Sequence, residues 1–587
     1  KPNMAQKGII KVSKTGEVFS SVTENEGVYQ PVYEVQGLPG AVFEITALED
    51  VYTLDGTLRY SAGEVVDTIT TGEDGTAQSQ PLYLGKFQVK EIQFPHGMVD
   101  TGENVTNVEL VYAGQEVEVT ETSASFYNQR QKALVTLDKV LEQDETFGIG
   151  MNGEISAVTF GLYAQEDITA ADGSVIPADG LLEIVSVNEN GQAVCSTDLP
   201  FGSFYLKELS TDSHYLLNGE TFPFTFEYGG PSVAVVEISA NDGEAVTNEL
   251  IRGEIKGLKT DENGTGLGGA VIGLFKSDET EFTAENALAT TTSADDGSFS
   301  FTNVPYGDWV LKELESPEGF ILSDEVIPVT VEEDGQVVEI SLANERVYGD
   351  LRLTKVDKDY PDNKLTGAEF EVYRDTNGNK ELDEGDELLG KLEETSTGIY
   401  EMSHILYGGV FVRETKAPEG FLLDENAYYV EITENGKIYE VENEAGIGFT
   451  NMAQTGSLRI EKTSSDGKVE GFSFRVTGAN GYDQTFKTDK NGEIFIEGLR
   501  VGDYTVSEVS DGASANYVLP ADKKVTILAD KTTVAQMHNE LRDTPKTGDD
   551  SKPWLWAALM GVSAMGAAAL GVAAYVGKRK KDNHTAK

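Results

Sequence analysis

The chain has 587 residues, with 45 Lys or Arg against 100 Asp or Glu, so its formal net charge at pH 7 is −55. This charge repels phosphate groups, which excludes nucleic acid as a partner, and the length exceeds what one hydrophobic core can serve. The one cysteine, Cys195, excludes disulfides as a source of stability, and we expect it to be a small buried hydrophobe rather than a reactive thiol.

The first residues repeat a sequence found much later in the chain. Residues 3–6 (Asn-Met-Ala-Gln) are identical to residues 451–454. We therefore expect residues 1–6 to be the end of a preceding domain, and the chain to be the C-terminal part of a longer protein. That expectation also accounts for an N-terminal sequence without the apolar core of a signal peptide.

Three landmarks then recur in a fixed order. An alternating apolar run ends in Lys, a second run opens with Gly and closes six positions later with Glu, and a third ends in Asn. The Lys residues are Lys14, Lys139, Lys259, Lys355 and Lys462; the Glu residues are Glu91, Glu208, Glu313, Glu414 and Glu508; the Asn residues are Asn128, Asn248, Asn344, Asn451 and Asn539. Each of these Lys residues stands eleven positions after an Asn, the first of them Asn3, although the blocks differ in length. A constant spacing between blocks of variable length is typical of a tandem array of domains.

The repeat predicts where the domains begin and end. We expect two longer domains at residues 7–130 and 131–250, then three domains at residues 251–346, 347–453 and 454–541. Short alternating runs separated by Asp-Gly and Asn-Gly turns predict β-strands throughout. The predicted fold class is therefore all-β, a tandem array of small antiparallel β-sandwiches.

The repeated Lys, Glu and Asn have the strand parity of the apolar residues around them, so they are predicted to face the cores. A charged side chain in a core is rare unless it is paired or chemically changed. In an apolar pocket a neutral Lys amine can attack the Asn carboxamide, while Glu polarises the carbonyl, shuttles protons and releases ammonia. The alternative is a buried Lys–Glu ion pair with Asn as its hydrogen-bond partner.

The array resembles the CnaB-type (SpaA-like, prealbumin-like) domains of Gram-positive surface adhesins and pilins. Besides the triads, the motifs that carry the resemblance are Gly-Ala-Glu-Phe at residues 367–370 and Pro-Glu-Gly-Phe at residues 317–320 and 418–421. The resemblance covers about residues 8–541 and is weakest in the first two domains. It implies immunoglobulin-like or prealbumin-like sandwiches, each closed by one Lys–Asn isopeptide bond that its Glu promotes. The bond forms once per domain, so no turnover enzyme and no required cofactor are expected.

One loop of the fourth domain has the spacing of a calcium site. Oxygen-bearing side chains stand at positions 1, 3, 5, 7, 9 and 12 of an EF-hand-like loop: Asp375, Asn377, Asn379, Glu381, Asp383 and Asp386. Lys380 stands where such loops have Gly, and Asp386 is shorter than the usual Glu. The alternatives are a Ca²⁺ site and a solvated acidic hairpin loop.

The C-terminal segment, residues 542–587, carries the predicted localisation signals. Residues 554–577 are uncharged and long enough to span a bilayer as a helix, and the basic residues 578–581 follow at once. With the sequence Thr544-Pro545-Lys546-Thr547-Gly548, this segment resembles a sortase sorting signal, in which Thr547 would be joined to peptidoglycan. The family's first residue is usually Leu, so Thr544 leaves the sortase class open.

The leading hypothesis is a stalk anchored in the Gram-positive cell wall that holds an adhesive domain away from the cell. The expected partners are sortase, peptidoglycan and, through the adhesin, host extracellular matrix. Alternatively, the chain is a pilus subunit joined to other pilins, the stalk of a surface enzyme whose catalytic domain lies upstream, or a protein whose long domains bind host matrix themselves.

Overall fold

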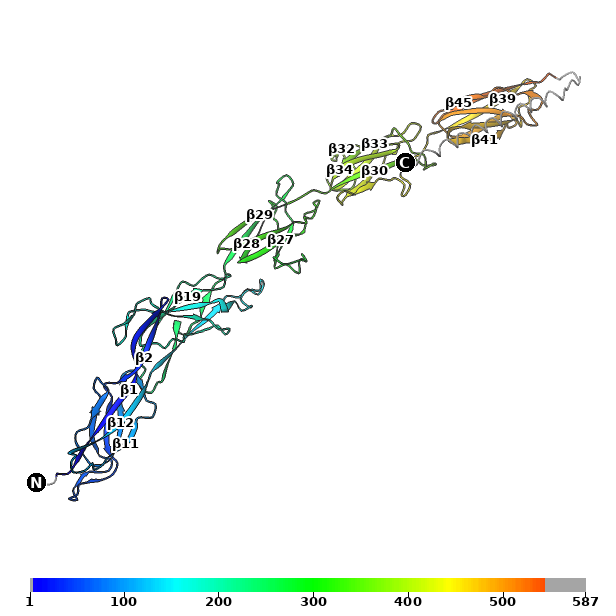
Figure 1. Ribbon diagram of the computed structural model, residues 1–587. Coiled ribbons are helices and arrows are strands. Elements are labelled where there is room, and N and C mark those ends of the chain that lie inside the picture. The colour runs from blue at the N-terminus through cyan, green and yellow to red at the C-terminus, as the bar shows by residue number, and fades with distance from the viewer. Residues whose placement is uncertain (1–3, 544–587) are drawn as a thin grey trace, which may run out of the picture. The chain divides into compact units, whose positions relative to one another are not determined.

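The computed structural model describes residues 4–543, so Asn3, the predicted sorting signal and the predicted membrane span lie outside the described residues. The chain divides into two compact units, residues 1–346 and residues 347–587, and each is described by itself. The described part contains strands and three short 3-10 turns, η1 (Glu154–Ala157), η2 (Ala240–Gly243) and η3 (Ala479–Gly481), and no α-helix. The predicted all-β fold of tandem sandwiches is confirmed (Figure 1).

The first unit contains three domains. The strands of the first are β1 (Lys7–Asn25), β2 (Val28–Gly37), β3 (Val42–Ala47), β4 (Val51–Tyr52), β5 (Leu58–Tyr60), β6 (Val65–Thr70), β7 (Thr76–Gln78), β8 (Leu82–Tyr83), β9 (Gly85–Gln93), β10 (Met98–Val99), β11 (Val105–Leu110) and β12 (Val119–Arg130). Those of the second are β13 (Lys132–Leu141), β14 (Thr159–Ala164), β15 (Ile168–Thr169), β16 (Val175–Ile176), β17 (Leu181–Ser186), β18 (Gln192–Val194), β19 (Gly202–Ser210), β20 (Thr221–Phe226), β21 (Val235–Ser239) and β22 (Val246–Asn248). Those of the third are β23 (Arg252–Asp261), β24 (Val271–Lys276), β25 (Ala289–Thr292), β26 (Ser298–Pro305), β27 (Gly307–Glu315), β28 (Val326–Val331) and β29 (Val337–Asn344).

The second unit contains two domains. The strands of the fourth domain are β30 (Tyr348–Asp357), β31 (Glu369–Arg374), β32 (Glu387–Lys391), β33 (Glu393–Ser396), β34 (Ile399–Leu406), β35 (Gly408–Lys416), β36 (Ala427–Ile432), β37 (Ile438–Glu440) and β38 (Phe449–Asn451). Those of the fifth are β39 (Thr455–Ser464), β40 (Ser473–Gly478), β41 (Tyr482–Lys487), β42 (Glu493–Arg500), β43 (Gly502–Val509), β44 (Tyr517–Val518), β45 (Lys523–Ile527) and β46 (Thr532–Leu541).

The third domain shows the shared topology most simply. One sheet has the order β26-β23-β29 and the other has the order β25-β24-β27-β28. The first strand, β23, runs parallel to the last strand, β29, and antiparallel to β26. Because the first and last strands are parallel neighbours, the chain enters the domain at one end and leaves it at the other.

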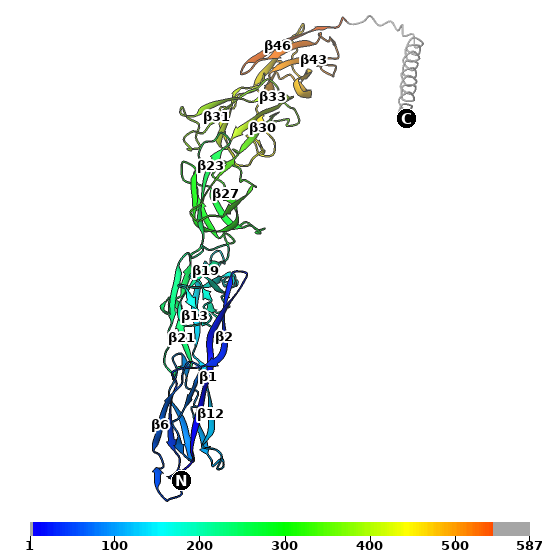
Figure 2. The same cartoon turned by 60° about the vertical axis from the view of Figure 1, so that its left-hand side comes forward.

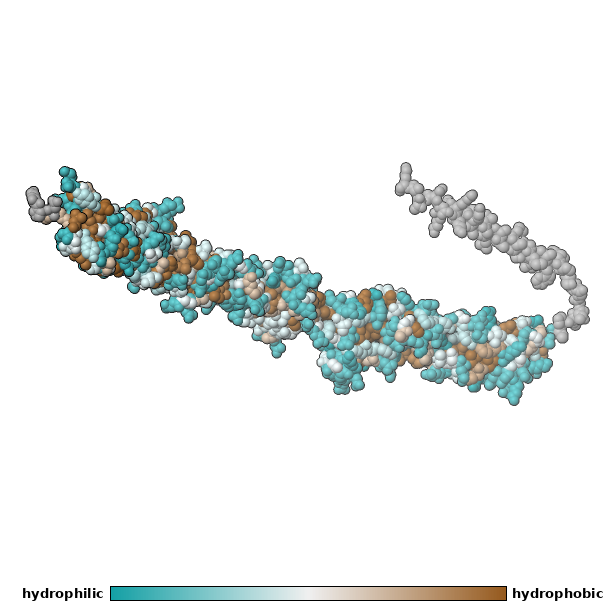
Figure 3. Space-filling model, turned by 90° about the horizontal axis from the view of Figure 1, so that it is seen from below, coloured by the Kyte–Doolittle hydropathy of each residue, from teal (hydrophilic) through white to brown (hydrophobic). Residues whose placement is uncertain are grey.

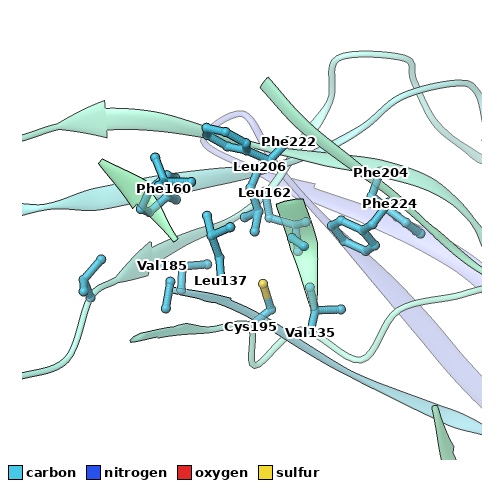
Figure 4. Packing of buried hydrophobic residues seen from close by; sticks show 14 of the residues in the cluster. Val135, Leu137, Phe160, Leu162, Val185, Cys195, Phe204, Leu206, Phe222 and Phe224 are labelled. Atoms are coloured by element: carbon cyan, nitrogen blue, oxygen red, sulfur yellow. The ribbon is translucent and has the colours of Figure 1, made fainter. Parts of the chain in front are cut away.

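Each domain has its own apolar core, formed by the facing sides of its two sheets. Figure 4 shows this packing in the second domain, where Cys195 lies among Val135, Leu137 and neighbouring apolar side chains. Cys195 follows β18 directly, and burial raises the pKa of its thiol to about 12. The face seen in Figure 3 is mostly hydrophilic, with small apolar patches, as the strongly acidic composition leads one to expect.

The first two domains share a β-hairpin. The first half of β1 pairs with β12, and its second half pairs with β2, which in turn pairs with β17 of the second domain. Phe19, Val22 and Tyr29 on this hairpin pack against the core of the second domain, and backbone N–H groups of the second domain donate to the Phe19 and Ser20 carbonyls, each at 3.0 Å. Figures 1 and 2 show β2 extending to the strands around β19. The hairpin therefore makes the two domains one packed body.

A substitution on this hairpin should destabilise the domain that it contacts. Replacing Phe19 with Ala removes apolar contacts with the second domain, so we expect that domain to lose about 1–2 kcal/mol of stability. Scanning calorimetry of the full chain, with limited proteolysis to identify the affected domain, measures this loss. The matched control is Val35→Ala on the same hairpin, because Val35 is 60% exposed. Equal effects of the two substitutions would contradict the role given to Phe19.

Candidate functional site: buried Lys, Glu and Asn triads

The Lys and Asn of each triad lie on neighbouring parallel strands in a constant register. In every domain the Lys is paired with the residue two positions before the Asn. The pairs are Lys14 with Phe126, Lys139 with Val246, Lys259 with Leu342, Lys355 with Phe449, and Lys462 with Met537. Since residues two apart share a face of a strand, the Lys and Asn side chains lie side by side on the core face.

The Glu of each triad comes from the opposite sheet. Its strand opens with Gly, and the Glu faces the core opposite an apolar residue of the neighbouring strand. These strands are β9, β19, β27, β35 and β43, and the paired residues are Phe43, Phe160, Ile272, Phe370 and Phe474. In the first four domains the register of this pairing shifts at the Glu, an irregularity of the kind that re-aims a side chain.

All of these side chains are buried. Lys259 and Lys355 are 0% exposed, and the largest value in any triad is the 8% of Glu508. The separation of Lys Nζ from the nearest Glu oxygen is 2.7 Å for Lys14, 3.3 Å for Lys259, 3.6 Å for Lys355 and 4.0 Å for Lys139. In the fifth domain Lys462 Nζ instead donates to the Thr463 carbonyl at 2.6 Å and lies 4.3 Å from the centre of the Phe472 ring.

The Asn side chain contacts the Glu in all five domains. Its Nδ2 donates to a Glu carboxylate oxygen over 2.6 to 3.2 Å. In the third domain the Asn344 Oδ1 accepts from Lys259 Nζ. The Oδ1 atoms of Asn128, Asn248, Asn451 and Asn539 are buried and accept from no donor among residues 4–543. The carboxylate therefore lies beside the amide nitrogen that a substitution at the Asn carbonyl would release.

Burial sets the protonation states of the triads. It lowers the pKa of all five Lys amines, against the opposing field of the nearby Glu. The pKa values of Lys139 and Lys355 fall to about 8. Burial also raises the pKa of Glu91 and Glu508. Both changes favour a neutral amine beside a protonated carboxyl, which is the pair that nucleophilic attack on an amide requires.

Three main-chain donors that were not predicted from the sequence also hold the Glu. In the second, third and fourth domains the N–H of the residue ten positions after the Glu donates to its Oε2, at 2.6 to 2.9 Å. These residues are Asn218, Ser323 and Asp424, and the side chain of each also accepts from the N–H two positions later. The sequence feature that could have identified these donors is an Asn, Ser or Asp ten positions after the Glu, a residue type that is common in turns.

The Pro-Glu-Gly-Phe motifs have a structural role in two of these loops. Phe320 N–H donates to the Pro317 carbonyl, and Phe421 N–H donates to the Pro418 carbonyl, each at 3.1 Å. These turns lie between the Glu and its main-chain donor, and they return the chain towards the carboxylate.

The predicted calcium loop is closed by its own hydrogen bonds. Asp375 accepts from the N–H groups of Gly378 and Lys380, and Asp383 accepts from the side chains of Asn377 and Asn379. The predicted residues Asn379 and Asp386 likewise accept from the N–H groups of Glu381 and Asp383. Within residues 4–543 no three His, Cys, Asp or Glu side chains are grouped as metal ligands. Calcium binding stays a prediction.

The predicted anchor lies beyond these sites. Thr544, Pro545, Lys546, Thr547 and Gly548 are outside the described residues. No helix in the described part of the chain has the length and apolar character needed to span a bilayer.

Comparison with known proteins gives one family. The model of the SpaA prealbumin-like fold domain matches residues 32–124, 253–346, 349–445 and 456–541. The second domain has no match to this model, although its triad has the same register and burial as the others. No curated protein sequence matches the chain.

Several solved structures resemble parts of the chain. The Bacillus anthracis TIE protein is 21% identical, and the alignment covers 69% of this chain and 73% of that chain, with a TM-score of 0.41. BcpA, the major pilin subunit of Bacillus cereus, is 14% identical over 58% of this chain and 100% of its own, with a TM-score of 0.26. The shaft pilin SpaA from Lactobacillus rhamnosus GG is 13% identical over 34% of this chain and 100% of its own, with a TM-score of 0.17.

Proposed function

Since this chain belongs to the SpaA prealbumin-like fold domain family, we propose that it is the structural stalk of a surface adhesin and that a Lys–Asn isopeptide bond closes each domain. The observation that carries the proposal is the same buried triad, in the same register, in all five domains. Domains that differ in length and loops retain this one arrangement.

The chemistry balances within each triad. The Glu carboxylate accepts a proton from the Lys ammonium, which leaves a neutral amine. The amine nitrogen bonds to the Asn Cγ, and the Cγ–Nδ2 bond breaks. Proton transfer through the Glu from the attacking nitrogen to Nδ2 releases ammonia, and the ammonia takes up the proton that the Glu first accepted and leaves as ammonium, so that the carboxylate is regenerated. The Glu contact with the Asn Nδ2 in every domain supports this role.

A covalent bond explains these residues better than an ion pair does. A buried ion pair is often no more stable than apolar residues of the same size, because both charges lose their hydration. Four of the five Asn also have a buried carbonyl oxygen that accepts from no donor in the described part of the chain, which is costly if the triad is only a hydrogen-bond network. Amide formation removes the buried ammonium and adds a permanent covalent link. Together these two gains offset the cost of the unpaired carbonyl oxygen.

The position of the bond suits a protein under tension. Each Lys lies on the first strand of its domain and each Asn on the last strand, which runs parallel to it. Force entering along the first strand passes through the bond into the last strand, so the remaining strands of the domain carry no load. This arrangement favours a stalk over a module that opens and closes.

The proposed location is the Gram-positive cell wall, with the segment from Thr544 to Gly548 recognised by sortase and joined to peptidoglycan. The pilus subunit is the second candidate that the sequence left open. Covalent ladders of this chain in cell-wall extracts would assign it to a pilus, and a single wall-linked species would assign it to a monomeric stalk.

The intact mass of the recombinant chain tests the bonds. We expect the mass to be lower than the sequence mass by one ammonia for each domain. Peptide mapping should place each loss on a Lys peptide joined to an Asn peptide of the same triad. Chains carrying Lys→Arg at a triad position serve as matched controls and should each retain one ammonia. A mass equal to the sequence mass would refute the cross-links in the domains concerned.

A further inference from the structure

A second buried carboxylate lies beside the triad in the third and fourth domains. Asp261 and Asp357 each stand two positions after the triad Lys, and each is paired in register with the triad Asn. Their side chains are 1% and 2% exposed. They share a strand face with the Lys, and in the fourth domain the Asp357 charge opposes the neutral form of the Lys355 amine.

An arginine binds each of these carboxylates, but the two arginines have different origins. In the third domain the arginine is Arg346, which stands two positions after the triad Asn. It donates to Asp261 Oδ2 at 2.6 Å. In the fourth domain the equivalent position is Ala453. The equivalence is set by the Pro-Glu-Gly-Phe loops, because Phe320 pairs with Arg346 and Phe421 pairs with Ala453.

The fifth domain supplies the missing guanidinium. Arg500, the last residue of β42, binds both Asp357 oxygens, with one distance of 2.8 Å, and also donates to Asp359 at 2.6 Å. Its guanidinium lies 4.7 Å from the centre of the Tyr360 ring. The neighbouring Val501 N–H donates to the Gln454 carbonyl, in the segment that joins the two domains. Arg500 is therefore held in place only when the fifth domain is folded and docked.

We propose that Arg500 is a positioning residue for the cross-link of the fourth domain, because it neutralises Asp357 beside Lys355 and so makes that cross-link depend on the following domain. This inference rests on the proposed isopeptide chemistry. The third domain has its arginine within itself and needs no neighbour. The fourth domain is completed by a side chain that is 143 positions away from its carboxylate.

The charges around Lys355 support this dependence. Burial lowers the pKa of Lys355 to about 8, and the carboxylates of Glu414, Asp424 and Asp357 oppose the shift. Glu414 takes part in the reaction, and Asp424 is held by Tyr428 and Asn443. Burial alone would raise the pKa of Asp357, but its bonds to Arg500 hold that pKa below its usual value. Without Arg500 the Asp357 charge acts on Lys355 without a counterion and keeps the amine protonated.

The test follows cross-linking in each domain of newly made full-length chains by quantitative peptide mapping. With Arg500→Ala, we expect the Lys355–Asn451 link to form about tenfold more slowly near neutral pH, because an increase of about one in the pKa of Lys355 reduces the neutral amine by that factor. Raising the pH should restore the rate. The links in the third and fifth domains of the same molecules are internal controls and should form at the normal rate.

Two further variants separate charge from simple docking. The double variant D357N/R500A lacks both the Asp357 carboxylate and the arginine that neutralises it, so it should cross-link at close to the rate of the unchanged chain. Arg475→Ala is the matched control, because Arg475 is an exposed fifth-domain arginine paired with Asp483.

The outcomes distinguish this inference from the function on which it rests. If the unchanged chain contains no Lys355–Asn451 link, the proposed function fails for that domain. If the unchanged chain is linked and R500A links equally fast, the role of Arg500 is refuted. If D357N/R500A is as slow as R500A, neutralisation of Asp357 is refuted as the cause.

Discussion

Replacing Glu414 with Ala should leave Lys355 unlinked and lower the melting temperature of the fourth domain by roughly 20 °C. Closing a loop of about 100 residues contributes roughly 4–5 kcal/mol if the chain-entropy treatment of disulfides applies to this bond. The substitution also leaves the Lys355 amine buried without its main counter-charge. Scanning calorimetry of the full chain should show one displaced transition, and peptide mapping should show the unlinked Lys355 and Asn451 peptides.

A second glutamate of the same domain provides the control. Glu431 is exposed and pairs with Lys380 at 3.5 Å, and such surface pairs contribute less than about 1 kcal/mol. Glu431→Ala should therefore leave both the link and the transition in place. A linked fourth domain in the Glu414→Ala chain would refute the role of this Glu.

A chain with Asn451→Ala should become more stable as the pH rises from about 8 to about 10.5. In this variant Lys355 cannot be acylated and remains titratable, with a folded-state pKa of about 8 against the ordinary lysine pKa of 10.5. Between these values the unfolded state binds more protons than the folded state, so the free energy of unfolding increases with pH. The gain across this window is on the order of 3 kcal/mol, at no more than about 1.4 kcal/mol per pH unit.

The cross-linked chain should not show this gain, because an amide nitrogen does not titrate. Denaturant unfolding of the fourth domain at several pH values measures the difference. The double variant K355M/N451A is the matched control, since it has neither the bond nor the amine, and its stability should not rise over the window. A similar pH dependence in the unchanged chain would show that Lys355 is free.

The sequence was sufficient to predict the fold and the burial of the repeated Lys, Glu and Asn side chains. Alternating runs and Asp-Gly turns are local signals, and they predicted sandwiches throughout. The triads could be recognised in the sequence because Lys and Glu stand at core-facing positions of strands, whereas charged side chains are ordinarily exposed. Lys14, Glu91 and Asn128 show this best, since their domain lacks the Pro-Glu-Gly-Phe motif and only the repeated spacings and the parity identify them.

The contacts between domains could not be predicted in this way. Residues 7–25 form one strand by their local pattern, and nothing near Phe19 indicates that its side chain packs against another domain. Arg500 and Asp357 are likewise brought together by tertiary structure alone. Both contacts depend on how folded domains dock, and a repeat pattern carries no information about docking.

The parallel pairing of first and last strands has a consequence for damage from outside the cell. With the Lys–Asn bond in place, each domain is a closed covalent ring, so one proteolytic cut between Lys14 and Asn128 leaves the molecule in one piece. Between Lys14 and Asn539, a single cut severs the chain only in the short segments between one Asn and the next Lys. Much of each such segment lies in a paired strand, namely β13, β23, β30 or β39. The segments that a protease must reach to sever the chain are thus among those that the fold protects best.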